Sequence, residues 1–181
     1  MELFEAIRER YSYRGEYEDR PVPREDLKQI VKAGLMAPSG TNAQTTGFVI
    51  VDDPESVAEI RGMHPGNKAL QQARAFIVCV IDRDPPAVYE GMDFQIEDCA
   101  AAVENILLSI TALGYGSVWV DGWLRREGRA DKIGQLLGVP DSKVVRILLP
   151  VGIPTGPGPR KEKKPFEERA WFNMWGVGSG E

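Results

Sequence analysis

A group of cationic and hydroxyl side chains follows the first predicted helix of the chain. Arg10, Ser12 and Arg14 occur within the five residues RYSYR. A guanidinium can hold two oxygens of a phosphate at once, and a serine hydroxyl adds a neutral donor. The segment is therefore a candidate phosphate site. The alternative is a solvated basic helix end, which the helix macrodipole also favours.

A second basic cluster lies near the C-terminus, in a loop rich in Pro and Gly. It contains Arg160, Lys161, Lys163 and Lys164, for which solubility is the simplest explanation. A third polar segment, APSGTNAQ at residues 37–44, has more hydrogen-bonding side chains than a connector needs before the apolar run FVIV. The three segments together favour a bound ligand over a merely solvated surface.

Several common sites are not indicated. GYGSVW has Trp119 where a dinucleotide fingerprint needs its third glycine, and there is no Walker loop. Ser39 lacks the GxSxG frame of a hydrolase, and His64 is the only histidine. Cys79 and Cys99 lie in apolar segments without CxxC spacing, so we expect buried thiols and no metal site.

Composition narrows the class of protein. The chain has 181 residues, 43% of them hydrophobic and 27% charged, and a formal net charge of -5. That balance is typical of one soluble domain, and the negative charge argues against nucleic acid or an anionic membrane as a partner. The first residues lack the apolar region of a signal peptide, and the apolar stretch 93–113 carries too many charges to span a membrane. We expect a cytoplasmic protein.

Apolar periodicity predicts the elements that must position these segments. Helical spacing appears at 2–11, after Pro23 and at 54–63, 93–113 and 129–137, and strand-like runs lie at 48–51, 75–82, 117–120 and 144–151. The run 75–82 is apolar on both faces, which favours a central strand. The stretch 93–113 is apolar around most of its circumference, which is typical of a core helix or a dimer helix. We expect an α+β fold with helices packed around one sheet.

The chain changes character after the last predicted strand. Pro and Gly there forbid regular structure, yet Trp171, Phe172, Met174 and Trp175 follow. Such a tail cannot bury these side chains on itself. We expect a single domain over residues 1–181 whose extended tail, residues 154–181, lies over a partner subunit.

The order and spacing of RYSYR, APSGTNAQ, GYGSVWVDGW, LLGVP and GIP resemble the FMN-dependent nitroreductase family over nearly the whole chain. The resemblance implies a nitroreductase-like fold, with a central mixed, mainly antiparallel sheet flanked by helices. It also implies an intertwined homodimer in which the C-terminal tail wraps the partner. The cofactor would be FMN, and NAD(P)H would be the electron donor.

The same resemblance implies which residues bind FMN. The phosphate would be held by Arg10 and Ser12 with Lys161 and Lys163, while Arg14 would reach the N1/O2 side of the flavin. The 37–44 loop would reach the FMN of the neighbouring subunit. The full set implied is Arg10, Tyr11, Ser12, Arg14, Pro38, Ser39, Gly40, Asn42, Gln44, Asn67, Lys68, Trp119, Val120, Asp121, Gly122, Lys161 and Lys163.

The implied reaction needs no catalytic side chain, because the cofactor carries the chemistry. Hydride would pass from NAD(P)H through the flavin to a small electron-poor acceptor, such as a nitroaromatic compound or a quinone, by a ping-pong mechanism. The chain departs from the family where Gln44 is followed by Thr45, Thr46 and Gly47 instead of Pro and Trp. The segment RDPPAVYEGM, before the long helix, is also short. Two alternatives therefore stay open: a protein that only holds FMN, and a flavin-modifying or dehalogenating member of the superfamily.

Overall fold

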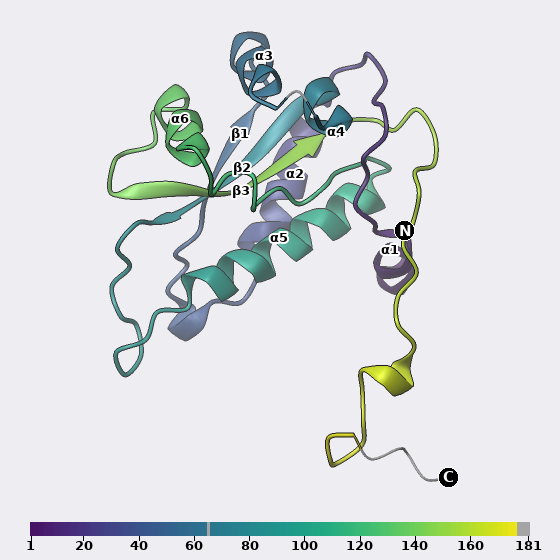
Figure 1. The fold of residues 1–181 in the computed structure, drawn as a ribbon, viewed down its shortest axis with the longest axis vertical. Helices are drawn as coiled ribbons and strands as arrows, with labels where there is room; N and C mark the ends of the chain where they lie inside the picture. The colour runs from purple at the N-terminus through teal and green to yellow at the C-terminus, as the bar shows by residue number, and fades with distance from the viewer. Residues whose placement is uncertain (65, 177–181) are drawn as a thin grey trace.

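The computed structural model describes residues 1–64 and 66–176. Its centre is a sheet of three strands, β1 (Gly47–Val51), β2 (Ala75–Asp82) and β3 (Lys143–Val151), in the order β1-β2-β3. Both pairings are antiparallel, with Gly47 opposite Val80 and Ala75 opposite Val151. The predicted central position of residues 75–82 is confirmed (Figure 1).

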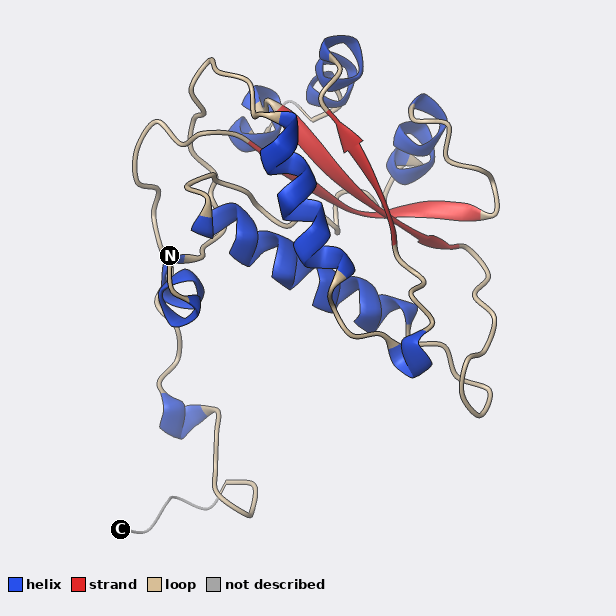
Figure 2. Ribbon diagram, turned by 180° about the vertical axis from the view of Figure 1, so that it is seen from behind, coloured by secondary structure: helices blue, strands red, loops and turns tan. Residues whose placement is uncertain are grey.

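Helices cover both faces of this sheet, as Figures 1 and 2 show. One face packs against α2 (Arg24–Leu35) and the long α5 (Gln95–Ala112), and α1 (Leu3–Glu9) lies beside α5. The other face packs against α3 (Pro54–Gly62), α4 (Lys68–Gln72) and α6 (Arg129–Leu136). The α+β arrangement that the sequence predicts is therefore the one observed.

The side chains of β2 explain why this strand is apolar throughout. Phe76 and Val78 point into the core beneath α3, α4 and α6, whereas Ile77 and Cys79 point toward α2 and α5. All four are fully buried. A strand buried on both faces cannot alternate with polar residues, because each would need a buried partner. Cys99 of α5 is also buried, so the predicted burial of both thiols is confirmed.

Two sequence-based expectations about the sheet need correction. No parallel pairing occurs among the residues the structure describes, so the sheet expected to be mixed is antiparallel in this part of the chain. Residues 117–120 form no continuous strand, and only single bridges, Gly116 with Gly152 and Val120 with Leu148, join this segment to the sheet region. The reason is a long-range contact, because the carbonyl of Ser117 accepts a hydrogen bond from the backbone of Tyr13 instead.

The first residues of the C-terminal tail contact Tyr17 and Tyr11, and its later described part extends away from the helices and the sheet (Figure 1). Apart from the short 3-10 helix η2 (Phe166–Glu168), it has no regular structure in its described part. Its rings pair only with one another, Phe166 with Phe172 at 6.2 Å and Trp171 with Trp175 at 4.3 Å between centroids. Residues 177–181 of the predicted tail lie outside the described residues.

Neither a membrane span nor a metal cluster occurs in the described ranges. No helix there has the length and apolar character needed to cross a bilayer. Residues 1–64 and 66–176 also contain no cluster of three or more His, Cys, Asp or Glu side chains with the placement of metal ligands.

Candidate functional site

The segment that contains RYSYR is fixed between two parts of the chain that lie far from it in sequence. The backbone N–H of Tyr13 donates to the carbonyl of Ser117 at 2.8 Å, and the N–H of Thr155 donates to the carbonyl of Glu16 at 3.0 Å. The segment therefore runs between residues 116–120 and the chain that leaves β3. The RYSYR segment, residues 116–120 and the chain that follows β3 therefore lie next to one another here.

Two glycines allow this close packing. A Cβ on Gly152 would lie 2.5 Å from Cγ of Tyr17, and one on Gly116 would lie 2.9 Å from Cδ1 of Tyr13. Burial, with Tyr13 and Tyr11 nearby, raises the pKa of Tyr17 well above its usual value, so its hydroxyl stays protonated. That hydroxyl donates to the carbonyl of Gly116 at 3.1 Å. The rings thus lie directly on the backbone of the neighbouring segments.

We expect Gly152→Ala to destabilise the protein by about 1 to 3 kcal/mol, the usual cost of forcing extra volume into a packed core. Loss of this much free energy of unfolding lowers Tm by several degrees in a protein of this size. Thermal unfolding of the variant checks the expectation. Gly156→Ala is the matched control, because a Cβ at Gly156 has no heavy atom within 4 Å. Equal Tm values for the two variants would contradict this packing.

The side chain of Tyr11 joins the two basic clusters, which are about as far apart in sequence as the chain allows. Its hydroxyl accepts a hydrogen bond from the backbone N–H of Gly158 at 2.9 Å, across 147 residues. The guanidinium of Arg160 lies over its ring, 4.6 Å from the centroid, and also pairs with Glu9 at 2.6 Å. The start of the C-terminal tail is thereby attached to the RYSYR segment.

The cations of this region differ in how they are neutralised. Arg10 is half-buried and pairs with Glu104 of α5 at 3.2 Å. Arg14 is exposed and donates only a long hydrogen bond of 3.4 Å to the carbonyl of Ser12. Lys161 and Lys163 are exposed, and neither forms an ion pair within the described part of the chain. Arg14, Lys161 and Lys163 therefore carry charge that no ion pair neutralises within the described part of the chain.

Asn67 and Lys68 lie beside the same segment, at the start of α4. The Asn67 side chain accepts from the backbone N–H groups of Ala69 and Leu70 at 3.1 and 3.4 Å, so it caps this helix. Lys68 donates to Glu16 at 3.0 Å. Asn67 thus has a structural role that needs no ligand, and any cofactor contact would come in addition.

Residues 119–122 place their side chains on different sides of the backbone. Trp119 packs on the α2 and α5 side of the sheet, whereas Val120 packs on the other side. The carboxylate of Asp121 pairs with Arg125 at 2.6 Å and with Arg146 at 2.7 Å. Its hydrogen bond raises the pKa of Arg125. Gly122 is exposed, and a Cβ added to it would meet no heavy atom within 4 Å, so its backbone is accessible.

The polar 37–44 loop lies at the N-terminal end of α5, where Gly40 contacts Asp98, while the RYSYR segment lies toward the other end of this helix (Figures 1 and 2). It contains the short 3-10 helix η1 (Gly40–Asn42). Ser39 accepts from the backbone of Gln44 at 3.0 Å, and Pro38, Asn42 and Gln44 are exposed. One chain therefore does not bring all the candidate cofactor residues together.

Cavities near the candidate residues are small. One of about 50 Å³ is lined by Arg10, Tyr11 and Ser117, and one of about 110 Å³ is lined by Pro38, Ser39 and Gln44. Sites for ligands of cofactor size usually measure about 300 to 1,000 Å³. Each group would therefore need another surface to complete a site of that size.

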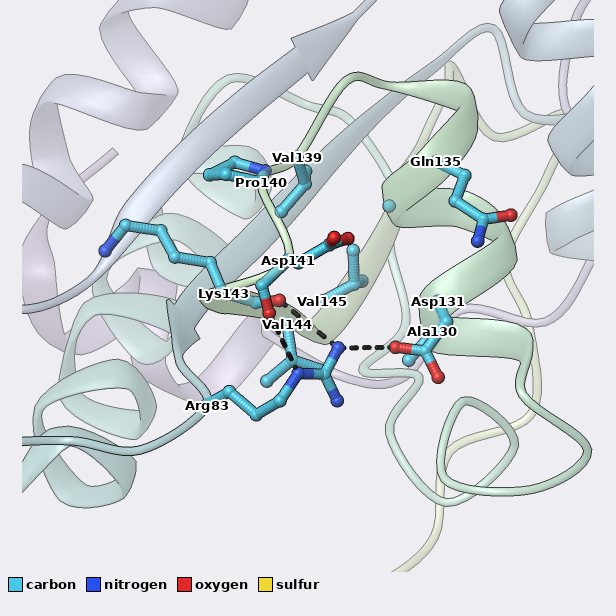
Figure 3. Close-up of a pocket in the computed structure, with 11 residues that line it drawn as sticks. Arg83, Ala130, Asp131, Gln135, Val139, Pro140, Asp141, Lys143, Val144 and Val145 are labelled. Carbon is cyan, nitrogen blue, oxygen red and sulfur yellow. Dashed lines mark hydrogen bonds and ion pairs between the residues drawn. The ribbon is translucent and has the colours of Figure 1, made fainter.

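A larger cavity, of about 400 Å³, lies elsewhere, between α6 and β3 (Figure 3). Its charged side chains satisfy one another or nearby groups: Arg83 pairs with Asp131 at 2.6 Å, and Lys143 pairs with Asp82 at 2.6 Å. None of the candidate cofactor residues lines it. Its size alone does not make it the functional site.

The chemistry of the first group fits the phosphate of FMN. Guanidinium, ammonium and hydroxyl groups are the donors that phosphate dianions prefer. The hydroxyl of Ser117, which lines the small cavity beside Arg10, is buried and has no hydrogen-bond partner among the described residues. An unsatisfied buried donor next to a cation is a feature that a bound anion can satisfy. Sequence reasoning missed Ser117, because a serine within the apolar run SVWV gives no signal of its own.

Known proteins resemble this chain over most of its length. The nitroreductase family model matches residues 7–76 and 65–153. A protein of Archaeoglobus fulgidus, provisionally named NADH dehydrogenase/NAD(P)H nitroreductase, is 37% identical over 152 residues, which cover 84% of this chain and 82% of that protein.

Solved structures agree in fold. An FMN-dependent nitroreductase of Clostridium difficile superposes with a TM-score of 0.78 at 27% identity, over 96% of this chain and all of that one. A provisionally named nitroreductase of Desulfovibrio desulfuricans, solved in complex with FMN, has a TM-score of 0.74 at 28% identity, over 93% and 94% of the two chains. Since sequence and fold agree over nearly the whole length, this chain belongs to the nitroreductase family.

Proposed function

We propose that this protein is an FMN-dependent oxidoreductase that transfers a hydride from NAD(P)H to a small electron-poor acceptor, such as a nitroaromatic compound or a quinone. Family membership and the names of its relatives support this class of reaction. The observation that carries the proposal is the contact of Tyr11 with Gly158 and Arg160, which attaches the start of the basic tail to the RYSYR segment.

The residues around Tyr11 would hold the cofactor. Arg10 and Ser12, with Lys161 and Lys163, would bind the phosphate, and Arg14 would provide positive charge near the pyrimidine edge of the flavin. Asn67 and Lys68 would contact that ring from the start of α4, where Lys68 pairs with Glu16, two residues after RYSYR. The accessible backbone at Asp121 and Gly122 would approach the central ring.

We propose a homodimer in which the 37–44 loop of one subunit completes the site of the other. The two groups of candidate residues lie toward opposite ends of α5, and neither has a cavity large enough for FMN (Figure 2). A two-fold partner can bring such groups together, because each subunit then contributes both ends. Apolar side chains that are exposed on α1 and on the tail support an interface, among them Phe4, Phe172 and Trp175.

When bound, FMN supplies the redox chemistry, because its isoalloxazine ring can accept a hydride from NAD(P)H and deliver it to the acceptor. The residues of the chain bind, orient and partly shield the ring, and no acid or base from the protein is needed. Donor and acceptor would use the same open face in turn, which implies ping-pong kinetics. We also propose a cytoplasmic location, in keeping with two free buried thiols.

Anaerobic mixing with a nicotinamide tests this proposal. We expect the purified protein to be yellow and to lose its flavin absorbance within seconds when mixed with NADH or NADPH in a stopped-flow instrument. The rate comes mainly from positioning, because a nicotinamide about 3 to 3.5 Å from the reacting atom needs no further catalyst. A quinone or nitroarene added afterwards should restore the colour.

A different result would favour the flavin-holding alternative. Tyr89 and Met92, which are 51% and 46% exposed on the short segment before α5, are the side chains available to cover a flavin face. If dithionite bleached the protein while neither nicotinamide did, the reaction proposed here would be wrong. The colour of the protein in the same preparation tests FMN binding separately from the choice of donor.

A further inference from the structure

Asp98 is an acidic residue in the first turn of α5, directly after Glu97. It is only 7% exposed. Its two carboxylate oxygens accept hydrogen bonds from the backbone N–H of Gly40 at 2.9 Å and from the hydroxyl of Thr45 at 3.3 Å. Asp98 forms no ion pair within residues 1–64 and 66–176. The hydrogen bonds to its carboxylate come from the 37–44 loop and from Thr45, the residue that follows this loop. A buried carboxylate is costly unless it is satisfied, and here the loop satisfies it.

The loop that Asp98 holds has an unfavourable backbone conformation. Thr41, Asn42 and Gln44 all have positive φ angles, 50°, 58° and 50°. Asn tolerates this region, but a β-branched residue such as Thr41 rarely occupies it. Such conformations persist only where the surrounding structure enforces them, and they are frequent at ligand-binding sites.

The contacts around Gly40 show how the conformation is enforced. A Cβ at Gly40 would overlap the ring of Phe94, which immediately precedes α5. The loop backbone is thus pressed against Phe94 on one side and bonded to Asp98 on the other. Ser39 closes the loop by accepting from the backbone of Gln44 at 3.0 Å. With these contacts in place, the side chains of Pro38 and Asn42 remain exposed.

We propose that Asp98 is a positioning residue for cofactor binding. By holding Gly40 and Thr45, it keeps the 37–44 loop in the one conformation that presents its polar groups to the FMN of the partner subunit. This inference rests on the proposed function, because it assumes that the loop contacts FMN. It adds that a residue buried in the helix, which touches no cofactor, sets the affinity for FMN.

The loop itself can be observed without cofactor. In the apoprotein we expect Asp98→Ala to accelerate hydrogen exchange of the Gly40 amide by about tenfold or more, because the bond that protects it is removed. Asp98→Asn keeps an acceptor oxygen for Gly40 and gains an amide that can donate to Thr45, so it should exchange nearly as slowly as the wild type. Exchange mass spectrometry of peptides that span residues 37–46 measures this.

Titration of the apoprotein with FMN then links the loop to the cofactor. We expect the Kd for FMN to rise about tenfold in Asp98→Ala and to stay within about threefold of wild type in Asp98→Asn. Val103→Ala is the control, because Val103 is fully buried in the same helix and its apolar side chain cannot form a hydrogen bond with the loop. It should lower stability while leaving loop exchange and FMN affinity near those of the wild type.

The outcomes separate the two proposals. Unchanged Gly40 exchange in Asp98→Ala, or faster exchange with unchanged FMN affinity, would overturn the positioning role while leaving the oxidoreductase proposal intact. Equal loss of affinity in Val103→Ala would overturn it too, since general destabilisation would then explain the effect. If the wild type bound no FMN, the proposed function would fall first and this inference with it. Should Asp98→Ala fail to fold, Thr45→Val removes one of the two bonds, and the inference requires about a threefold rise in Kd.

Discussion

Reversal of both Lys161 and Lys163 to Glu is expected to raise the Kd for FMN about a hundredfold. A charge-assisted hydrogen bond contributes about 1.5 to 3 kcal/mol, and each 1.4 kcal/mol changes affinity tenfold. Two lost contacts to a phosphate dianion, replaced by repulsion, account for at least two factors of ten. Titration of the apoprotein, followed by flavin fluorescence, measures the change.

The two lysines suit this test because the fold does not depend on them. Both are exposed and form no ion pair within the described residues, so their reversal breaks no contact that the structure contains. Arg10 is less suitable, because Arg10→Glu would also break the ion pair with Glu104 of α5 and place a second carboxylate beside it. The matched control is the pair Arg126→Glu and Lys132→Glu, which gives the same change in net charge at exposed positions around the start of α6.

Riboflavin, which is FMN without its phosphate, provides a second control. If Lys161 and Lys163 act through the phosphate, the variant should bind riboflavin as the wild type does, while FMN loses its advantage. Raising the salt concentration should weaken FMN binding more in the wild type than in the variant, since screening acts on the charges that the variant lacks. Unchanged FMN affinity in the variant would remove these lysines from the cofactor site.

Elements with a strong apolar pattern are predictable from the sequence of this protein. The run at residues 75–82 is apolar on both faces because β2 lies between two layers of helices, and the apolar circumference of residues 95–112 reflects a helix packed on several sides. Local signals fail where long-range contacts decide the structure. Residues 117–120 have the composition of a strand, yet the Ser117 carbonyl bonds to Tyr13 instead of a neighbouring strand.

The candidate site shows the same division. Residue types predict that Arg10, Ser12 and the basic tail bind an anion, and the resemblance to a family orders them, but spacing cannot show that Tyr11 contacts the start of the tail across 147 residues. In the sequence Asp98 is one of several acidic residues of this helix, beside Glu97 and Glu104, and no local pattern distinguishes it. Its role appears only when the fold places it against Gly40 and Thr45. Which residues assemble across subunits depends on symmetry, and a single chain does not encode that in any local pattern.

Removal of residues 166–181 is expected to convert the proposed dimer into a monomer at micromolar concentration and to release FMN. Phe166, Phe172 and Trp175 are 56%, 67% and 86% exposed in the single chain. An aromatic side chain buries about 150 to 250 Å² when covered, at about 25 cal/mol per Å². After the cost of ordering the tail is subtracted, we expect the free energy of dimerisation to weaken by about 4 kcal/mol. A change of this size weakens the dimer about a thousandfold.

Sedimentation velocity and the flavin absorbance of the same samples measure both effects. The control is a chain that ends at Gly176, because the residues removed there, VGSGE, contain no aromatic side chain. This shorter deletion should leave the dimer and its colour close to those of the wild type. Loss of FMN together with the dimer would fit a site that lies between subunits, since each subunit alone has only small cavities beside its candidate residues. A protein lacking residues 166–181 that remained dimeric, yellow and equally resistant to heat would show that the tail does not hold the partner, and the exposed aromatic side chains would then need another explanation.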